Sequence, residues 1–286
     1  MKRNFTRSNK NDKISFLKNK NFIKENKNEI VKSSLSLKAN QLVLSGKHAA
    51  LSALRNTQRR LFYLISTQEH SKVWEKNIMD LGLSIEVKIK TKEQLDLINN
   101  FKPHQNVILI VEHLKRISLD EFLTEKQHTF NKKPLRIIIL DQVTDPQNVG
   151  AIIRSAYAFK MNALALSQTN SPIESSSMSK ASSGAIEKLE IIELSNMSRA
   201  IKKLQDENFR VYGLAHGGDG NIFDLEEEVG NVAIIVGSEG KGLRRLTREK
   251  VDQLIEIPIN PESESLNVSN AASISMFQLQ KNFIKI

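Results

Sequence analysis

Three short segments of the chain combine residue types that can bind or activate a substrate. In the first, Asn148, Gly150 and Arg154 form the pattern N-x-G-x-x-x-R. Asn148 suits the start of a helix, whose free N–H groups attract anions. Arg154 follows about two turns inside that helix and adds a permanent cation with a planar fork of donors. The segment fits an anion-binding site, and taken alone it fits a capped surface helix equally well.

The second segment is rich in glycine and follows a buried apolar run. Gly237, Gly240 and Gly242 are spaced G-x-x-G-x-G around Glu239. Glycine allows the backbone to approach a ligand closely, although a tight turn needs it as well. The spacing differs from the dinucleotide fingerprint G-x-G-x-x-G, and Lys241 is not followed by the Ser or Thr of a phosphate loop. Dehydrogenase and NTPase functions are therefore disfavoured.

The third segment is a polar loop that leads into a helix dense in small residues. It reads Ser265, Leu266, Asn267, Val268 and Ser269. Its Ser and Asn residues suit helix caps, and the small residues that follow allow another helix or a ligand to pack closely. By itself this segment indicates no particular chemistry.

The elements around these segments predict a mostly parallel α/β sheet, because short apolar strands alternate with helices. Strands are expected at 136–141, 163–166, 190–193, 210–214, 232–237 and 254–258. Helices are expected at about 149–159, 175–183, 197–207, 243–250 and 267–283. All three segments follow strands, and ligands of such sheets bind beyond the carboxyl ends of the strands. The three segments are therefore expected where such sheets bind their ligands.

The composition divides the 286 residues into parts. Residues 1–40 hold eleven basic and three acidic side chains, a net charge of +8, which leaves +2 of the total +10 for residues 41–286. We interpret 1–40 as a basic disordered extension: a solvated tail, an RNA-contacting arm or, less in keeping with its few arginines, a transit peptide. Residues 41–112 form a small α/β unit, 113–134 a polar linker, and 135–286 the larger domain.

Composition also excludes several classes of protein. The chain has no cysteine, which excludes disulfides, thiolate metal sites and cysteine nucleophiles. No apolar run approaches the ~20 residues of a membrane span. The six histidines show no metal-binding spacing, so His48 and His104 are better interpreted as RNA contacts or loop residues. The basic excess predicts a polyanionic partner, nucleic acid first and an anionic membrane surface second.

Together, and in this order, the three segments resemble the signature motifs of the SpoU (TrmH) family of RNA 2′-O-ribose methyltransferases, in the SPOUT class. The matching residues are Asn148, Gly150 and Arg154; Gly237, Glu239, Gly240 and Gly242; and Ser265 to Ser269. The segment 179–185 resembles the family's small-residue stretch between motifs. The segments 46–50 and 103–109 resemble the substrate-binding domain, similar in fold to the ribosomal L30e protein, of the RlmB-type branch.

The resemblance implies an L30e-like N-terminal domain and a catalytic α/β domain with a C-terminal trefoil knot. It implies S-adenosyl-L-methionine as the methyl donor, no metal, a homodimer formed through the knot region, and a cytoplasmic protein. By motif matching, the cofactor contacts would be Gly237, Ile257 and Leu266. The implied catalytic residue is Arg154, positioned together with the ribose by Asn148, Glu239, Ser265 and Asn267.

Two aspects of the implied function remain open. Arg154 would activate the ribose oxygen electrostatically, since an arginine pKa above ~12 disfavours its use as a base, and Glu239 would alternatively hold its own loop through a salt bridge. The first substrate hypothesis is a guanosine of 23S rRNA. The alternatives are tRNA as the target of the same chemistry, or a catalytically silent RNA-binding assembly factor.

Overall fold

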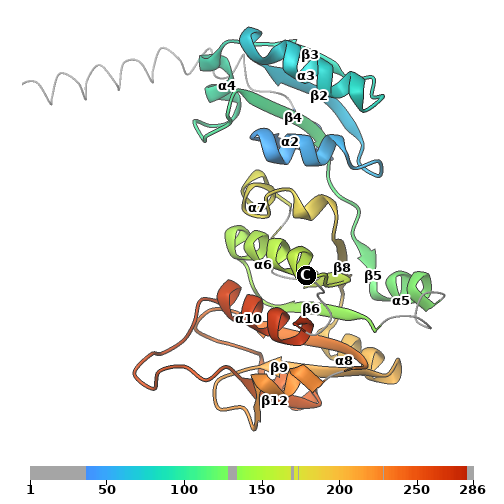
Figure 1. The fold of residues 1–286 in the computed structure, drawn as a ribbon, viewed down its shortest axis with the longest axis vertical. Helices are drawn as coiled ribbons and strands as arrows, with labels where there is room; N and C mark the ends of the chain where they lie inside the picture. The colour runs from blue at the N-terminus through green and yellow to red at the C-terminus, as the bar shows by residue number, and fades with distance from the viewer. Residues whose placement is uncertain (1–36, 128–133, 169–170, 173, 228, 282–286) are drawn as a thin grey trace, which may run out of the picture.

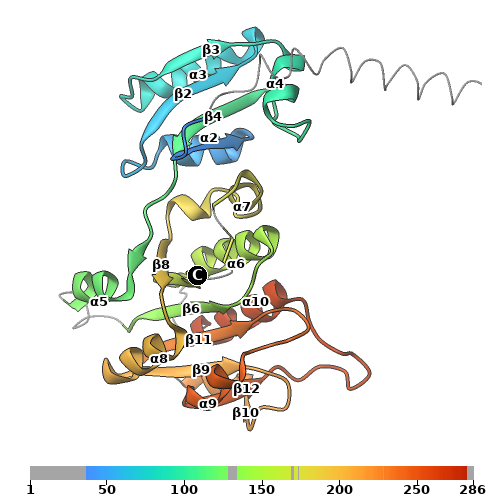
Figure 2. The same ribbon diagram turned by 180° about the vertical axis from the view of Figure 1, so that it is seen from behind.

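The computed structural model describes residues 37–127, 134–168, 171–172, 174–227 and 229–281, and these form two sheets (Figures 1 and 2). Most of the basic extension predicted for 1–40 lies outside the described residues. The N-terminal sheet has the strand order β1-β4-β2-β3. Its elements are β1 (Gln41–Ser45), α2 (Lys47–Leu54), β2 (Leu61–Ser66), α3 (Gln68–Asp80), β3 (Glu86–Ile89), α4 (Lys92–Ile98) and β4 (Val107–Glu112).

The larger sheet has the order β10-β12-β9-β11-β6-β7-β8-β5, and every strand pair in it is parallel. Its strands are β5 (Ile117–Ser118), β6 (Arg136–Asp141), β7 (Ala163–Ser167), β8 (Glu190–Leu194), β9 (Phe209–Leu214), β10 (Gly220–Asn221), β11 (Asn231–Gly237) and β12 (Gln253–Glu256). The predicted mostly parallel α/β fold is thereby confirmed.

Helices cover both faces of this sheet because its strands are apolar on both sides. In β6, Ile138 and Leu140 point into one core and Ile137 and Ile139 into the other. One face is covered by α6 (Pro146–Ala158), α7 (Ser176–Ala181), η1 (Ala185–Glu187), η2 (Ile222–Glu227) and α10 (Val268–Gln280). The other face carries α5 (Leu119–Gln127), α8 (Met197–Asp206) and α9 (Arg245–Lys250).

The segment 113–134, expected to be an irregular linker, carries two regular elements. Strand β5 pairs with β8 at the edge of the larger sheet, and helix α5 packs on the same sheet. Three apolar residues at helical spacing, Leu119, Phe122 and Leu123, are all buried there. A helix of about two turns gives only a weak periodic signal among polar residues, so the sequence pattern did not predict this helix.

The two sheets face each other across α2 and the α7–η1 segment, which lie side by side in both views (Figures 1 and 2). Gly184 adopts the left-handed conformation, with φ of 81°. A Cβ at Gly184 would stand only 2.0 Å from Oγ of Ser52. The hydroxyl groups of Ser45 and Ser176 are also 2.9 Å apart across this boundary. Small residues in the segment 179–185 therefore allow the two domains to approach closely.

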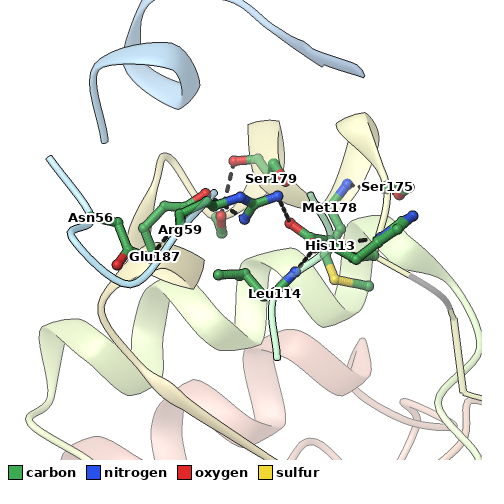
Figure 3. Close-up of polar contacts among 10 residues, drawn as sticks. Asn56, Arg59, His113, Leu114, Ser175, Met178, Ser179 and Glu187 are labelled. Atoms are coloured by element: carbon green, nitrogen blue, oxygen red, sulfur yellow. Dashed lines mark hydrogen bonds and ion pairs between the residues drawn. The ribbon is translucent and has the colours of Figure 1, made fainter. Parts of the chain in front are cut away.

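A buried charge cluster joins the two domains (Figure 3). Arg59, from the loop before β2, pairs with Glu174 and Glu187 of the larger domain, each at 2.8 Å. The side chains of all three residues are at most 6% exposed. Asn56 donates to Glu187 at 2.9 Å, and the N–H of Leu114 donates to Glu174 at 2.7 Å. One arginine therefore balances two buried carboxylates contributed by the other domain.

We expect Arg59→Met to destabilise the protein by about 3–5 kcal/mol, because it leaves two buried carboxylates without their cation. The free energy of unfolding, measured by urea denaturation at pH 7.5, checks this. Arg60→Met is the matched control, since the neighbouring Arg60 is exposed and only lies over the ring of Phe62. Equal stability of the two variants would contradict the role given to Arg59.

The loss of stability caused by Arg59→Met should be smaller at acidic pH. Burial raises the pKa of Glu187, while Arg59 and the hydrogen bond from Asn56 oppose this rise. A carboxyl whose pKa is higher in the folded state contributes stability that is present at low pH and is lost as pH rises through that pKa. Without Arg59 the pKa of Glu187 should rise further. The stability difference between Arg59→Met and the natural protein should therefore be smaller at pH 5 than at pH 8.

Candidate active site

The carboxyl ends of four parallel strands form one row across the larger sheet. Gly237 at the end of β11 lies beside Asp141 of β6, and Ser167 of β7 lies beside Leu194 of β8. Leu140 and Leu166 pair between β6 and β7, which brings Asp141 next to Ser167. The three motif segments leave the sheet at this edge or at the carboxyl end of β12, as expected for loops that follow strands.

Residues from all three motifs meet in one hydrogen-bonded group. The carboxylate of Glu239 accepts from the Asn148 side chain at 3.2 Å, from the Asn267 side chain, and from the backbone N–H of Val268 at 3.4 Å. The Asn267 amide also donates to Asn148 at 3.2 Å. Glu239 therefore connects the three loops as a hydrogen-bond acceptor, and no ion pair involving it occurs among the described residues.

A cavity of about 410 Å³ lies beside this group. Its lining includes five of the eight site residues expected from the sequence: Gly237, Glu239, Ile257, Ser265 and Leu266. Apolar contacts come from Leu214, Val236 and Ile257, residues 237–242 form one wall, and Arg248 and Glu264 add charged side chains. The cavity therefore combines apolar and polar lining, which suits a small molecule with an aromatic or aliphatic part and polar groups.

Gly237 is required for the shape of that wall. A Cβ at this position would stand 2.1 Å from the carbonyl carbon of Gly242 and 2.4 Å from the backbone nitrogen of Leu243. The backbone N–H of Gly242 donates to the carbonyl of Ser238 at 2.9 Å, which closes the loop tightly on itself. Any side chain at Gly237 would therefore push the loop away from the end of β11.

Asp141 is a functional residue that motif reasoning missed. It is fully buried, and its carboxylate accepts from Nε of Arg244 at 2.7 Å, from the backbone N–H of Arg244 at 3.2 Å and from the hydroxyl of Thr247 at 2.8 Å. These bonds fix the start of α9 against the end of β6. The available signal was an acidic residue ending an otherwise apolar strand.

Arg154 lies apart from the hydrogen-bonded group. It sits in α6, is exposed, and neither lines the cavity nor pairs with any other described residue. Its neighbour Ser155 accepts from the hydroxyl of Ser273 in α10 at 2.6 Å, which holds the two helices together. The structure thus brings together Asn148, Glu239 and Asn267 beside the cavity residues, with Arg154 outside this group.

The structure changes two expectations, one about the residue that caps α6 and one about His104. Asp145, followed by Pro146, caps α6 through its bond from the N–H of Gln147, so Asn148 lies inside the first turn and is free to reach Glu239. In α10, Asn267 is the cap, as its sequence context suggested.

His104 is buried and its ring nitrogen lies 2.9 Å from the carboxylate of Asp96. It is therefore a loop residue that stabilises its own segment.

Among the described residues, no cluster of three or more histidine or acidic side chains could hold a metal ion. No helix in that part of the chain is long and apolar enough to cross a membrane. What the geometry provides is a cavity beside a group of amide and carboxylate side chains, at the ligand-binding edge of a parallel sheet.

A sequence model of the SpoU rRNA Methylase family matches residues 135–277. The chain is also 34% identical, over 82% of its length and 95% of the relative's, to the 23S rRNA (guanosine-2′-O-)-methyltransferase RlmB of Haemophilus influenzae. The chain belongs to the SpoU rRNA methylase family. A TrmH family tRNA/rRNA methyltransferase of Staphylococcus aureus is likewise 34% identical, over 71% of this chain and 80% of that one.

Solved structures support the fold of this SpoU family member. The SpoU methyltransferase AviRb from Streptomyces viridochromogenes, solved in complex with AdoMet, superimposes with a TM-score of 0.72 at 19% identity, over 85% of this chain and 91% of that one. The likeness includes both domains, since it extends well beyond residues 135–277. The family predicted from the three motifs is thereby confirmed, and the protein is an RNA methyltransferase of this family.

Proposed function

We propose that the protein transfers the methyl group of S-adenosyl-L-methionine to a ribose 2′-hydroxyl of ribosomal RNA, with a guanosine of 23S rRNA as the first candidate. The main support for this function is the hydrogen-bonded group that Asn148, Glu239 and Asn267 form beside the 410 Å³ cavity. The name of the Haemophilus influenzae relative supports the ribose and the guanosine. The tRNA alternative stays open, because other relatives are named tRNA/rRNA methyltransferases.

The cavity fits the proposed methyl donor. Its apolar side, with Leu214, Ile257 and Leu266, suits an adenine ring, and the wall of residues 237–242 presents backbone donors and acceptors to polar groups. The position that a Cβ of Gly237 would occupy is already filled by the backbone of Gly242 and Leu243, so only glycine fits where the loop packs against the end of β11. S-adenosyl-L-methionine supplies an electrophilic methyl group on a sulfonium.

The protein's own residues would orient and activate the ribose. Asn148 and Asn267 hold the Glu239 carboxylate, and this arrangement leaves amide and carboxylate groups beside the cavity to position a hydroxyl. Ser265 lines the cavity and can contact the same sugar. Arg154 would bind an RNA phosphate and stabilise negative charge on the attacking oxygen. Holding hydroxyl and methyl donor together would supply much of the acceleration.

A homodimer fits the exposed surface near Arg154. Ile274 and Phe277 of α10 are 40% and 52% exposed and lie one turn apart on the same helix, so they form an apolar patch. Phe277 packs edge-on against Phe159, which joins α6 and α10 in one surface. Arg154 precedes Ser155, whose hydroxyl meets that of Ser273 in α10, so pairing of two such patches would bring Arg154 near the second protomer. The trefoil knot that the resemblance implies stays a prediction.

The direct test of function is to map 2′-O-methyl nucleotides in rRNA and tRNA from cells with and without this protein. We expect one guanosine of 23S rRNA to lose its methyl group when the protein is absent. Loss at a tRNA position instead would select the tRNA alternative. Loss at neither RNA, together with no methyl transfer by the purified protein to either RNA, would overturn the enzymatic proposal.

Arg154→Ala should lower the single-turnover methylation rate by about 100-fold or more, as removal of one group that stabilises charge in a transition state does. The dissociation constant of S-adenosyl-L-methionine should not change, because Arg154 does not line the cavity. Rapid-quench methylation and calorimetry measure the two quantities. A variant that methylates as fast as the natural protein would remove Arg154 from the catalytic role.

Phe277→Asp should convert the proposed dimer to a monomer, because it places a charge in the middle of the apolar patch. Analytical ultracentrifugation measures the change, with Met79→Asp as control, since Met79 is 72% exposed but lies on α3 in the N-terminal domain. A natural protein that sediments as a monomer would show that the patch does not pair two copies.

A further inference from the structure

A second cavity, of about 490 Å³, opens at the same edge of the larger sheet. It lies where β7 and β8 end, against the start of α8 and the segment that begins α9. Its polar lining includes Ser167, Ser195, Asn196, Ser198, Arg244 and Arg245. None of these residues belongs to the three motifs or to the first cavity.

The lining of this second cavity is positively charged. Arg244 and Arg245 both line it, and no acidic residue of the described chain does. The Nε of Arg244 is held by the buried carboxylate of Asp141, which fixes the direction of the guanidinium while the side chain stays 42% exposed. Arg245 is 77% exposed and pairs with Glu249. One arginine is therefore preorganised, and the second is held only at the surface.

The opposite wall offers hydrogen-bond donors. Asn196 caps α8 by accepting from the N–H of Arg199, and the N–H groups of the first helical turn, around Ser198, have no acceptor inside the helix. Ser167 is only 6% exposed, and none of the described residues hydrogen-bonds its hydroxyl. A nearly buried hydroxyl without a partner in a basic cavity points to a ligand with oxygen acceptors.

We propose that this cavity binds a phosphodiester group of the substrate RNA, on the strand that carries the methylated ribose. The inference rests on the proposed function. An arginine fork, a helix N-terminus and serine hydroxyls together suit a phosphate group. A polymer is favoured over a free anion because residues 238–248 border both cavities, the first through Ser238 to Gly242 and Arg248 and the second through Arg244 to Thr247.

The neighbourhood of the two cavities also agrees with this assignment. With strands about 4.8 Å apart, the row from Gly237 to Leu194 spans roughly 14 Å, a distance that a few nucleotides of one strand can bridge. Since residues 41–286 carry a net charge of only +2, local basic sites of this kind have to supply the attraction of that part of the chain for RNA.

Ser198→Asp tests the proposal without weakening the fold, because an acidic residue in the first turn of a helix stabilises it. Arg245→Gln is a second variant, which gives up only an exposed ion pair. Arg210→Gln is the matched control: it makes the same change of one charge unit at the amino-terminal part of β9, beside Gln253. The probe is rRNA from cells that lack the protein, and the measurement is its dissociation constant over a range of salt concentrations.

We expect both cavity variants to bind this rRNA at least tenfold more weakly and to reduce the salt slope by about 1, with unchanged affinity for S-adenosyl-L-methionine. Arg210→Gln should match the natural protein. Equal RNA affinity in all variants would overturn the inference. A second result would also overturn it: inorganic phosphate stabilises the natural protein but not Ser198→Asp, while both bind RNA equally well. That result would identify a site for a free anion. Failure of methylation with RNA binding altered as expected would count against the proposed function alone.

Discussion

The buried carboxylate of Asp141 is the interaction on which the carboxyl edge of the sheet depends. It ends β6, is inaccessible to solvent, and accepts three hydrogen bonds from residues 244–247. A buried charge is tolerated only when such donors surround it. The chain after the glycine-rich loop is therefore held against the strand that precedes the first motif. That attachment brings the loop of residues 238–242, and Glu239 within it, to Asn148 and Asn267.

Two cavities on either side of this attachment follow from it. The same segment presents backbone groups and Glu239 to one cavity and a fixed arginine to the other. A methyl donor and an RNA strand could then be held by neighbouring parts of one loop. A second buried cluster, with Arg59 between Glu174 and Glu187, ties the N-terminal domain to the face that carries α6 and α7. In both clusters an arginine balances buried carboxylate charge.

Local sequence patterns predicted much of this arrangement, and long-range contacts account for what they missed. The strand 136–141 agrees with β6 to the residue, because an apolar run that alternates with helices has few other interpretations. The motifs also named Asn148, Glu239 and Asn267, whose side chains do meet. By contrast, Asp141 finds its partners more than a hundred residues away, and so do Arg59 and Glu187. No local pattern records such pairs, or tells that Asp145 caps α6 while Asn148 reaches Glu239.

The affinity of Asp141→Asn for S-adenosyl-L-methionine, measured by calorimetry, tests most directly whether this carboxylate shapes the site. Asparagine keeps the size of the side chain but turns one acceptor into a donor that opposes the Arg244 and Thr247 donors. With circular dichroism confirming that the variant is folded at the temperature used, we predict binding at least tenfold weaker than in the natural protein. An unchanged dissociation constant would contradict the dependence of the cavity on Asp141.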